Sequence, residues 1–512
     1  MRSFRLVQER LKYKYMMDFL DPKKRRAHEI KLIIGYILIG LAVVLATVLL
    51  LYMAYGFGLN KGQVVQNGLI FVSSTPSGSN VYVNGQQRGT TGERLFLQAG
   101  TYTMEIKRTG YRTWQRAVTV EGGMVEHFDY PFLFPSNLQT TDRKTYTTAP
   151  ALATQSPDRR WILIEQPGPL GTFDMYDIKN EKQVATSTVT LPSSLLTTSD
   201  AKVQSLKLVE WSNDNQHVLL EHVYGSSHEY IMLDTQTPTQ SVNVTKTLGL
   251  TPSDQLSLQN KKFDHYFVYD SNAGTLDTDA LSSPTLTPLL THVLAYKTNG
   301  PNMVLYTTGQ DAPSGEVNVM LYQNNKSYEL RTLPVDKTYL LNLTQYSGTW
   351  YVAAGARSDN RVYVYKDPVS VLGQQGQLLV PITVLRVDTP DYLEFSANTQ
   401  FIMAAHDNHF AVYDAQYDKT YAYTIDAHFD VPQLHATWMD GDRITYVSGD
   451  KLVVFDYDST NLQTLMPSSP AYLPFFDQNY HYVYDLATSA ATSKTPAQTQ
   501  FTRTALLTPA DQ

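Results

Sequence analysis

The stretch "LEFSANTQFIMAAHDNHFAVYD", residues 393–414, contains the pattern that decides the fold of this chain. A polar turn, SANTQ, leads into an apolar run, and a second polar turn leads into a run that ends in Tyr-Asp. Short runs of aliphatic and aromatic residues between turn residues indicate β-strands. The stretch therefore predicts a pair of antiparallel strands with a turn on either side.

The last run of this stretch has eight loose copies along the chain. Each copy has two or three β-type residues, then Tyr, Leu or Phe, then a polar residue, and the mean spacing is 44 residues. The copies are FDMYD (173–177), YIMLD (230–234), YFVYD (266–270), VMLYQ (319–323), VYVYK (362–366), FAVYD (410–414), LVVFD (452–456) and HYVYD (481–485).

This repeat predicts a β-propeller. A four-stranded blade takes ~40–45 residues and buries its faces only against neighbouring blades. The pattern resembles TolB-like and WD-type propellers, in which a turn such as "SPD" enters a strand and "YD" closes a later one, although the WD dipeptide is absent. We expect seven or eight blades over residues 148–508, and eight copies favour eight. Stacked β-sandwiches and a β-solenoid are the alternatives, and the irregular spacing argues against a solenoid.

The two ends of this repeat region carry further expectations. Residues 134–147 are polar and predict a linker, and residues 487–500 are low in complexity and predict a loop. Residues 501–507, "FTRTALL", have a strand-like pattern. Such a strand could pair with an early strand and close the ring, which would remove two exposed sheet edges.

An apolar segment lies near the N-terminus. Residues 32–60 contain no charged side chain, and about 20 apolar residues are enough to cross a bilayer as a helix. We expect a transmembrane helix over residues 32–56. A buried core helix and a cleaved signal peptide are the alternatives, but the run is long for either one.

The charges around this segment predict its orientation. Residues 1–31 carry ten Lys or Arg and four Asp or Glu, whereas the remainder carries 31 basic and 44 acidic residues. By the positive-inside rule, residues 1–31 form a basic cytoplasmic tail and the acidic body lies outside the cell membrane. An acidic body also argues against nucleic acid as the main partner.

Residues 66–133 predict a small β-sandwich or barrel. The strand-like runs at 69–74, 81–88, 94–114 and 116–123 give about five strands in a meander, with a tight hairpin turn at Asn84-Gly85. The stretch resembles the PEGA domain family in Thr75-Pro76, "VYVNG" (81–85), Gly89-Thr90 and "GYRTW" (110–114), but it has Pro-Ser-Gly-Ser at 76–79 and Gly92 where a proline is usual. The resemblance implies an extracytoplasmic prokaryotic module, structural or binding, with no catalytic residues to carry over.

The chain offers few candidates for chemistry. It has no cysteine, which excludes disulfides, cysteine nucleophiles and thiolate metal sites. His406 and His409, with His428 and His435 nearby in sequence, could bind a metal, but this spacing lacks a clear third ligand. The Asp-rich turns at 439–443 and 456–461 lack the spacing of an EF-hand, and turn chemistry explains them equally well. We therefore assign no catalytic, cofactor-binding or metal-binding residue, and we expect no cofactor.

Two function classes remain open. The first is a membrane-anchored surface protein that binds a cell-envelope polysaccharide or a surface protein. The second is an extracytoplasmic glycan or peptide hydrolase with carboxylates at the mouth of the propeller. Three or more acidic side chains gathered at one mouth would favour the enzyme, whereas a mouth lined with Tyr, Asn and Thr would favour binding. An enzyme is the less favoured class, and the sequence leaves the oligomeric state open.

Overall fold

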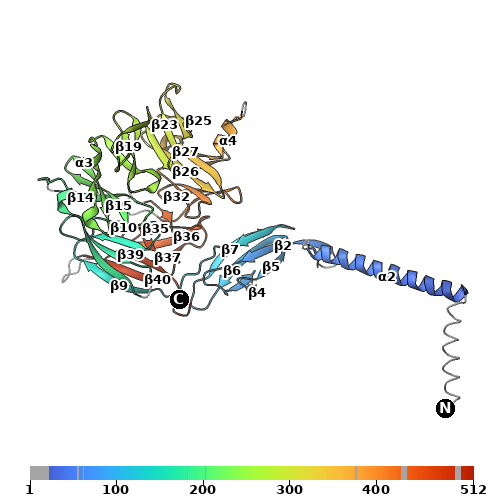
Figure 1. Cartoon of the computed structure of the whole chain (residues 1–512). Helices are drawn as coiled ribbons and strands as arrows, with labels where there is room; N and C mark the ends of the chain where they lie inside the picture. Colours follow the sequence, from blue (N-terminus) through green and yellow to red (C-terminus); the bar gives the residue numbers. More distant parts are fainter. Residues whose placement is uncertain are drawn as a thin grey trace, which may run out of the picture. The chain divides into compact units, whose positions relative to one another are not determined.

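The computed structural model describes residues 22–54, 57–60, 63–180, 183–201, 203–374, 378–427, 435–489 and 497–511. The chain divides into two compact units (Figure 1). The first unit extends to Arg108 and includes Thr113–Leu133, and the second contains Thr109–Arg112 and everything from Phe134 onward. We describe each unit by itself.

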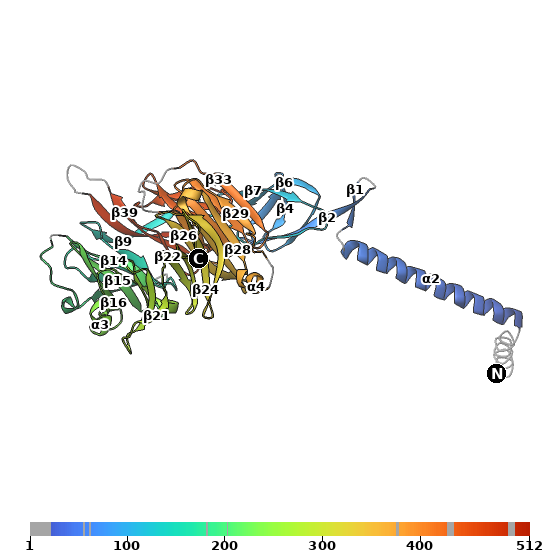
Figure 2. The ribbon, with the colours of Figure 1, turned by 90° about the horizontal axis from the view of Figure 1, so that it is seen from above.

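Helix α2 (Pro22–Ala54) is a single uninterrupted helix (Figures 1 and 2). Its segment Arg26–Tyr52 has a mean hydropathy of 2.8, and none of its most apolar stretch is buried in the protein. Its aliphatic side chains are exposed on all sides, whereas the core helix of a soluble protein buries at least one face. Length and composition fit a membrane-spanning helix or a signal sequence.

The rest of the first unit is a β-sandwich of two four-stranded sheets, which confirms the predicted fold class of this region. Side chains that alternate along the strands fill its core, including Ile70, Val81, Met104 and Trp114. One sheet contains β1 (Phe57–Asn60), β2 (Gln63–Val72), β5 (Arg94–Gln98) and β8 (Val125–Phe128), and the other contains β4 (Gln86–Thr90), β3 (Asn80–Val83), β6 (Gly100–Lys107) and β7 (Trp114–Val120).

The strand order of the sandwich differs from the simple meander that we expected. β5 pairs with β2, whereas β6 pairs with β3 and β7, so the chain changes sheets at the turn between β5 and β6. The hairpin turn was predicted correctly: Asn84 and Gly85 join β3 to β4 with φ of 49° and 77°. β8 was missed because its parallel pairing with β2 is a long-range contact that local patterning does not reveal.

The described part of the second unit contains eight four-stranded antiparallel sheets, which we call blades 1 to 8, and this confirms the predicted propeller (Figures 1 and 2). Blades 1 to 4 contain, in order, β10 (Ala153–Gln155), β11 (Trp161–Glu165), β12 (Thr172–Asp177) and β13 (Ala185–Thr190); β14 (Gln204–Trp211), β15 (His217–Tyr224), β16 (Ser227–Asp234) and β17 (Val242–Asn243); β18 (Asp254–Leu258), β19 (His265–Asp270), β20 (Thr275–Ala280) and β21 (Thr287–Leu290); and β22 (Ala295–Asn299), β23 (Met303–Thr308), β24 (Glu316–Gln323) and β25 (Lys326–Pro334).

Blades 5 to 8 follow the same plan. They contain, in order, β26 (Tyr339–Tyr346), β27 (Thr349–Ala356), β28 (Arg361–Lys366) and β29 (Thr383–Arg386); β30 (Tyr392–Phe395), β31 (Phe401–His406), β32 (His409–Asp414) and β33 (Lys419–Thr424); β34 (Thr437–Trp438), β35 (Arg443–Ser448), β36 (Lys451–Asp456) and β37 (Gln463–Pro467); and β38 (Phe475–Phe476), β39 (Tyr482–Ser489), β40 (Gln498–Ala505) and β9 (Gln139–Tyr146). Short helices α3 (Val244–Leu248) and α4 (Pro368–Leu372) and the 3₁₀ turns Ser193–Leu195, Pro238–Gln240, Gln259–Lys261 and Arg357–Asp359 lie in the connections.

The middle strands of the blades carry continuous apolar runs because both of their faces are covered. In β32, for example, the five residues after His409 are all buried. Consecutive blades share apolar clusters, such as the one between blades 4 and 5 that contains Leu321 and Val352. Similar clusters join blades 1 and 2, 2 and 3, 3 and 4, 5 and 6, and 8 and 1. A strand buried on both faces reads as one hydrophobic run rather than an alternation.

The ring is closed by a strand from each end of the second unit. β9 pairs with β40 through a ladder from Gln139↔Ala505 to Tyr146↔Thr499. This confirms that residues 501–507 contribute a strand that pairs with an early one. It also corrects two expectations: β9 lies within the segment 134–147 that we expected to be a linker, and β39 and β40 extend into the loop expected at 487–500. β9 is rich in polar residues because an outermost strand of a blade has one side exposed to solvent.

The eight sequence copies fall one on each blade, but not at the same position. Six lie on the third strand, whereas YFVYD (266–270) and HYVYD (481–485) lie on second strands, β19 and β39. This change of strand explains why the copies at 266 and 481 follow their predecessors after only 36 and 29 residues. The two short spacings therefore reflect a change of strand, whereas the 57-residue spacing between the first two copies, both on third strands, includes the long connection from β13 to β14.

The final Asp of many copies has a structural role. Asp234 Oδ1 accepts hydrogen bonds from the backbone N–H groups of Gln236 and Thr237, both at 2.9 Å, and so shapes the turn after the strand. Asp414 binds the backbone of Gln416 in the same way, at 2.9 Å. The Asp at the end of these copies thus stabilises the turn that follows the strand, and its presence needs no catalytic explanation.

Candidate functional site

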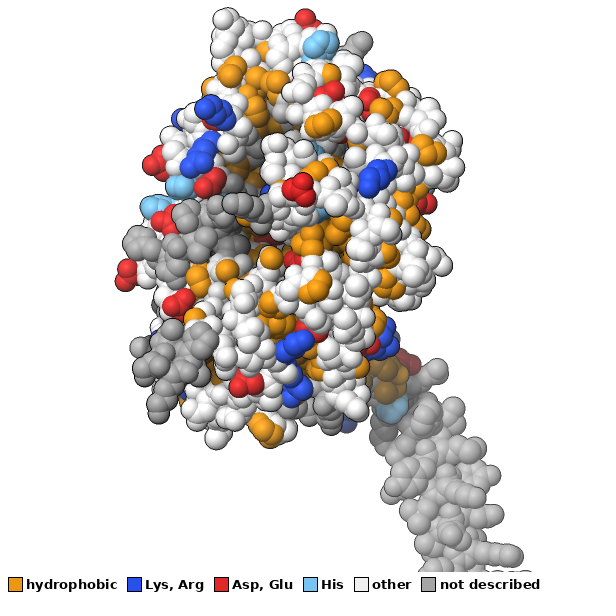
Figure 3. Space-filling view, turned by 90° about the vertical axis from the view of Figure 1, so that its left-hand side faces the viewer, with side chains coloured by type: hydrophobic (Ala, Val, Ile, Leu, Met, Phe, Trp, Pro, Cys, Tyr) orange, Lys and Arg blue, Asp and Glu red, His pale blue; other side chains and the backbone are white. Residues whose placement is uncertain are grey.

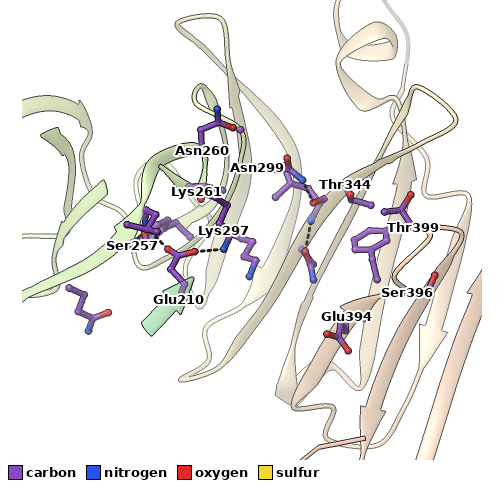
Figure 4. Close-up of a pocket in the computed structure, with 18 residues that line it drawn as sticks. Glu210, Ser257, Asn260, Lys261, Lys297, Asn299, Thr344, Glu394, Ser396 and Thr399 are labelled. Carbon is purple, nitrogen blue, oxygen red and sulfur yellow. Dashed lines mark hydrogen bonds and ion pairs between the residues drawn. The ribbon is translucent and has the colours of Figure 1, made fainter. Parts of the chain in front are cut away.

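The first strands of blades 2 to 6 line one cavity of about 670 Å³ (Figure 4). Neighbouring first strands lie against each other, as β22 does against β26 and β26 against β30. The cavity therefore collects side chains from segments far apart in sequence. The lining consists of Glu210, Gln255, Ser257, Leu258, Asn260, Lys261, Tyr296, Lys297, Thr298, Asn299, Gly300, Asn342, Leu343, Thr344, Glu394, Phe395, Ser396 and Thr399.

Two asparagines in the lining connect neighbouring blades. Asn299 Nδ2 donates to the carbonyl oxygen of Leu343 at 3.0 Å, and Asn342 Nδ2 donates to that of Leu393 at 3.1 Å. Each amide thus reaches from one first strand to the backbone of the next. These two side chains connect the strands that form the wall of the cavity, so their amide N–H groups are already used within the protein.

Glu210 and Lys261 form a hydrogen-bonded ion pair at one side of the cavity (Figure 4). Glu210 also accepts a hydrogen bond from the backbone N–H of Leu258. The Lys261 charge is therefore compensated within the protein. Nearby, the hydroxyl groups of Ser257 and Tyr296 are 3.1 Å apart and within hydrogen-bond distance.

Lys297 differs from Lys261 because it has no hydrogen bond or ion pair with any described residue. Its side chain is exposed and open to the cavity. Partial desolvation by the cavity walls and the like charge of Lys261 lower the pKa of Lys297, whereas Glu210 and Glu394 raise it. The ammonium group is therefore unpaired among the described residues and accessible from the cavity.

Glu394 is the second carboxylate of the lining and comes from β30 in blade 6. Burial raises its pKa, while hydrogen bonds from Tyr392 and Thr437 and the charge of Lys297 lower it in part. Thr437 Oγ1 lies 3.3 Å from Glu394 Oε2. No ion pair joins Glu394 to Lys297 within the described residues, so each presents its polar group to the cavity.

The lining fits the expectation for binding better than that for catalysis. Its only two carboxylates are Glu210 and Glu394, and Glu210 is already paired with Lys261. Asn, Thr, Ser and Gln supply most of the remaining polar groups. The cluster of three or more acids that would favour a hydrolase does not occur among the residues that line this cavity.

The histidines considered as metal ligands are arranged around a carboxylate instead. His406 Nδ1 lies 2.8 Å from Asp391 Oδ2, and His435 Nδ1 lies 3.7 Å from Asp391 Oδ1. His409 is exposed on β32 opposite His406, and His428 lies outside the described residues. Within the described ranges, no group of three His, Asp or Glu side chains could hold a metal ion.

The Asp-rich turn at 439–443 forms a buried charge cluster. Asp440 Oδ1 accepts from the backbone N–H groups of Asp442 and Arg443, both at 2.8 Å, and its carboxylate also pairs with the Arg443 guanidinium. Burial and the charge of Asp440 raise the pKa of Asp442 to about 7. These contacts explain the turn without a bound ion. In the other turn, Asp456 Oδ2 accepts from the amide of Asn461 at 2.8 Å.

One face of the second unit carries few charges (Figure 3). Hydrophobic side chains and uncharged surface make up most of this view, and the Lys, Arg, Asp and Glu side chains are scattered in small groups. This view shows no continuous basic face of the kind that nucleic-acid binding requires.

Comparison with known proteins identifies one family within the chain. Residues 67–133 match the PEGA domain, as expected from the sequence. No curated protein sequence matches this chain.

Solved structures with a similar fold match this chain at low identity. Kluyveromyces lactis Hsv2 shares 10% identity over 69% of this chain and 97% of its own, with a TM-score of 0.37. The Dos1 propeller shares 11% identity over 72% of this chain and 96% of its own, with a TM-score of 0.44. The assignment of a propeller therefore rests on the sheet pairing of the chain itself.

Proposed function

We propose that this chain is a single-pass, membrane-anchored extracytoplasmic protein whose propeller binds a cell-envelope polymer or a surface protein. In this proposal, α2 is the anchor and the PEGA domain is a stalk or adaptor. The N-terminal tail stays in the cytoplasm and the two β units lie outside the cell.

The charge distribution and the exposed helix support the anchored topology. The apolar side chains of α2 are exposed on all sides, and such a surface is stable in lipid rather than in water. Five Lys or Arg residues lie within residues 21–31, just before the apolar segment, whereas Lys61 is the only one in the segment 56–87 that follows it. This asymmetry favours an N-terminus in the cytoplasm.

The cavity of the ring is the observation that carries the binding role. It is large enough for a small ligand or for a segment of a polymer, since ligand sites commonly measure ~300–1,000 Å³. Its lining offers hydrogen-bonding groups from five blades on a rigid scaffold. The acidic charge of the body supports a partner other than nucleic acid.

Binding can be tested with the full-length chain in lipid nanodiscs. We expect the nanodiscs to retain a defined polysaccharide or protein from solubilised cell-envelope fractions, with empty nanodiscs as the control. Recovery of shortened glycans or peptides would instead support the hydrolase. Failure to retain any envelope component would contradict the proposed binding role.

A further inference from the structure

Lys297 is the feature of the cavity that the internal contacts leave unexplained. An ammonium group on a cavity wall is either paired with a carboxylate of the protein or left open to an anionic ligand. Lys261, on the same side of the cavity, is paired with Glu210. Lys297 is paired with no described residue. Its ammonium group is therefore available to a ligand in the cavity.

Several neighbours of Lys297 are also available. The side chains of Thr298, Thr344, Gln255 and Asn260 line the cavity and make no hydrogen bond with another described residue. They contrast with Asn299 and Asn342, which are tied to backbone carbonyls. The free groups both donate and accept hydrogen bonds, which is the pattern that hydroxyl groups of a ligand require.

We propose that the cavity binds an anionic group on a polyhydroxylated molecule, such as an acidic sugar or a polyol phosphate, and that Lys297 pairs with the anion. This inference rests on the proposed envelope-binding function and names the chemistry of the ligand. The Glu394 carboxylate, on a different blade, would accept hydrogen bonds from ligand hydroxyls. A lysine ammonium serves a carboxylate and a phosphate equally well because it acts as a point charge.

The composition of the cavity favours this ligand over a neutral sugar or a cation. A neutral sugar would leave Lys297 unpaired, and a cation would meet an ammonium group that no described residue neutralises at close range. A long apolar ligand would bury the free polar side chains without partners. An anion with hydroxyl groups would pair with Lys297 and with its free neighbours at the same time.

The binding test uses the full-length chain in nanodiscs and four probes at low ionic strength. The probes are a glucuronic acid oligosaccharide, a glycerol phosphate oligomer, a neutral glucose oligosaccharide and glycerol, with isothermal titration calorimetry as the readout. We expect at least one anionic probe to bind more tightly than its neutral counterpart. The preferred anion then distinguishes a carboxylate source from a phosphate source.

Three variants connect this preference to Lys297. Lys297→Gln should weaken binding of the preferred anion by about ten- to hundredfold, the usual effect of losing a charge-assisted hydrogen bond. Lys297→Arg should retain most of the affinity because it keeps the charge. Lys451→Gln is the matched control, because Lys451 is exposed at the start of β36 and does not line the cavity.

The outcomes separate this inference from the function on which it rests. If the Lys297→Gln variant binds the anion as tightly as the wild type, or if neither anion binds better than its neutral counterpart, the inference is wrong. Retention of the same envelope polymer by wild type and variant would then place the binding surface elsewhere on the protein. If the wild type retains no envelope component, the proposed function itself fails.

Discussion

Asp485 is a carboxyl group that the ring buries completely. It lies on β39 with no exposed surface, and its Oδ2 atom has no hydrogen-bond partner among the described residues. Burial raises its pKa to about 7 from an ordinary value of 3.8. Between these two values the folded state keeps a proton that the unfolded chain has released. The free energy of unfolding therefore falls as the pH rises through this range.

The Asp485→Asn variant tests this dependence. The amide cannot ionise, so the variant should lose less stability than the wild type between pH 5 and pH 8. At about 1.4 kcal/mol per pKa unit, the difference amounts to a few kcal/mol. Denaturant unfolding at the two pH values measures it.

Asp270→Asn is the control for this experiment. Backbone N–H groups of Ala273 and Asn272 hold the pKa of Asp270 below its usual 3.8. The stability that Asp270 contributes is present above that value and is lost only as the pH falls through its lower folded pKa. The Asp270→Asn variant should therefore show the same change in the free energy of unfolding between pH 5 and pH 8 as the wild type. An Asp485→Asn variant with the wild-type pH dependence would contradict the prediction.

Single residues also mark the limit of what the sequence predicts about the site. Lys297 lies in "AYKTN", which reads as one ordinary strand among many. Its importance depends on the neighbours that four other blades supply, and these are up to about 100 residues away in sequence. Local patterning identifies strands but not which strands share an axis. The one available signal was a charged residue within an otherwise uncharged strand-like run.

At the scale of a turn, the hairpin between β3 and β4 depends on Gly85. Its φ of 77° is in the left-handed region, and no atom lies within 4 Å of the position that a Cβ would occupy. The cost of a side chain there is therefore conformational rather than steric. We expect Gly85→Ala to reduce the stability of the β-sandwich by ~1–2 kcal/mol, as measured by thermal unfolding.

Gly309→Ala provides the comparison. Gly309 also has open space around it, but its φ lies outside the left-handed region. This variant should unfold like the wild type or be slightly more stable, since alanine restricts the unfolded chain. Equal destabilisation by both variants would show that the left-handed backbone of Gly85 is not the cause.

At the scale of a strand, β9 has a role that no other outer strand shares. Every other fourth strand follows the third strand of its own blade directly along the chain, whereas β9 reaches blade 8 from the opposite end of the unit. We expect prolines at Thr140 and Thr141 to remove a hydrogen bond from the ladder with β40 and to loosen the ring. Hydrogen exchange should show loss of protection in β39 and β40, and the melting temperature should fall.

Prolines at Thr186 and Ser187 in β13 form the matched control. This strand is also outermost, but it pairs with β12 of its own blade. The loss of hydrogen-exchange protection should be confined to blade 1, and the melting temperature should fall less than in the β9 variant. Similar losses in both variants would mean that ring closure adds nothing to the stability of a blade edge.

At the scale of the whole molecule, the sequence repeat predicted the number of blades more accurately than the residues at which strands and linkers begin and end. Eight motif copies indicated eight blades because each blade needs one strand buried on both faces. The PEGA sandwich and the apolar helix were also predicted from local pattern. The assignment of 134–147 was wrong because a polar outer strand and a polar linker have the same composition. Pairing between β9 and β40 spans more than 350 residues, beyond the reach of any local signal.

The absence of cysteine makes the topology testable with single thiols. In intact cells, a membrane-impermeant maleimide should label Ser358→Cys, which is exposed in the connection between β27 and β28. Ser3→Cys should react only after the cells are permeabilised. The reverse pattern, or labelling of neither site before permeabilisation in cells without a shielding layer, would contradict an extracytoplasmic body.

The seam between β9 and β40 has a mechanical consequence. The chain enters the ring at Gln139, the first residue of the closing strand. If a cell pulls on its anchored terminus while a captured polymer resists, the load reaches this strand before it reaches any complete blade. The rupture force of one strand-to-strand ladder, rather than the stability of the propeller as a whole, would then set how much tension the attachment withstands.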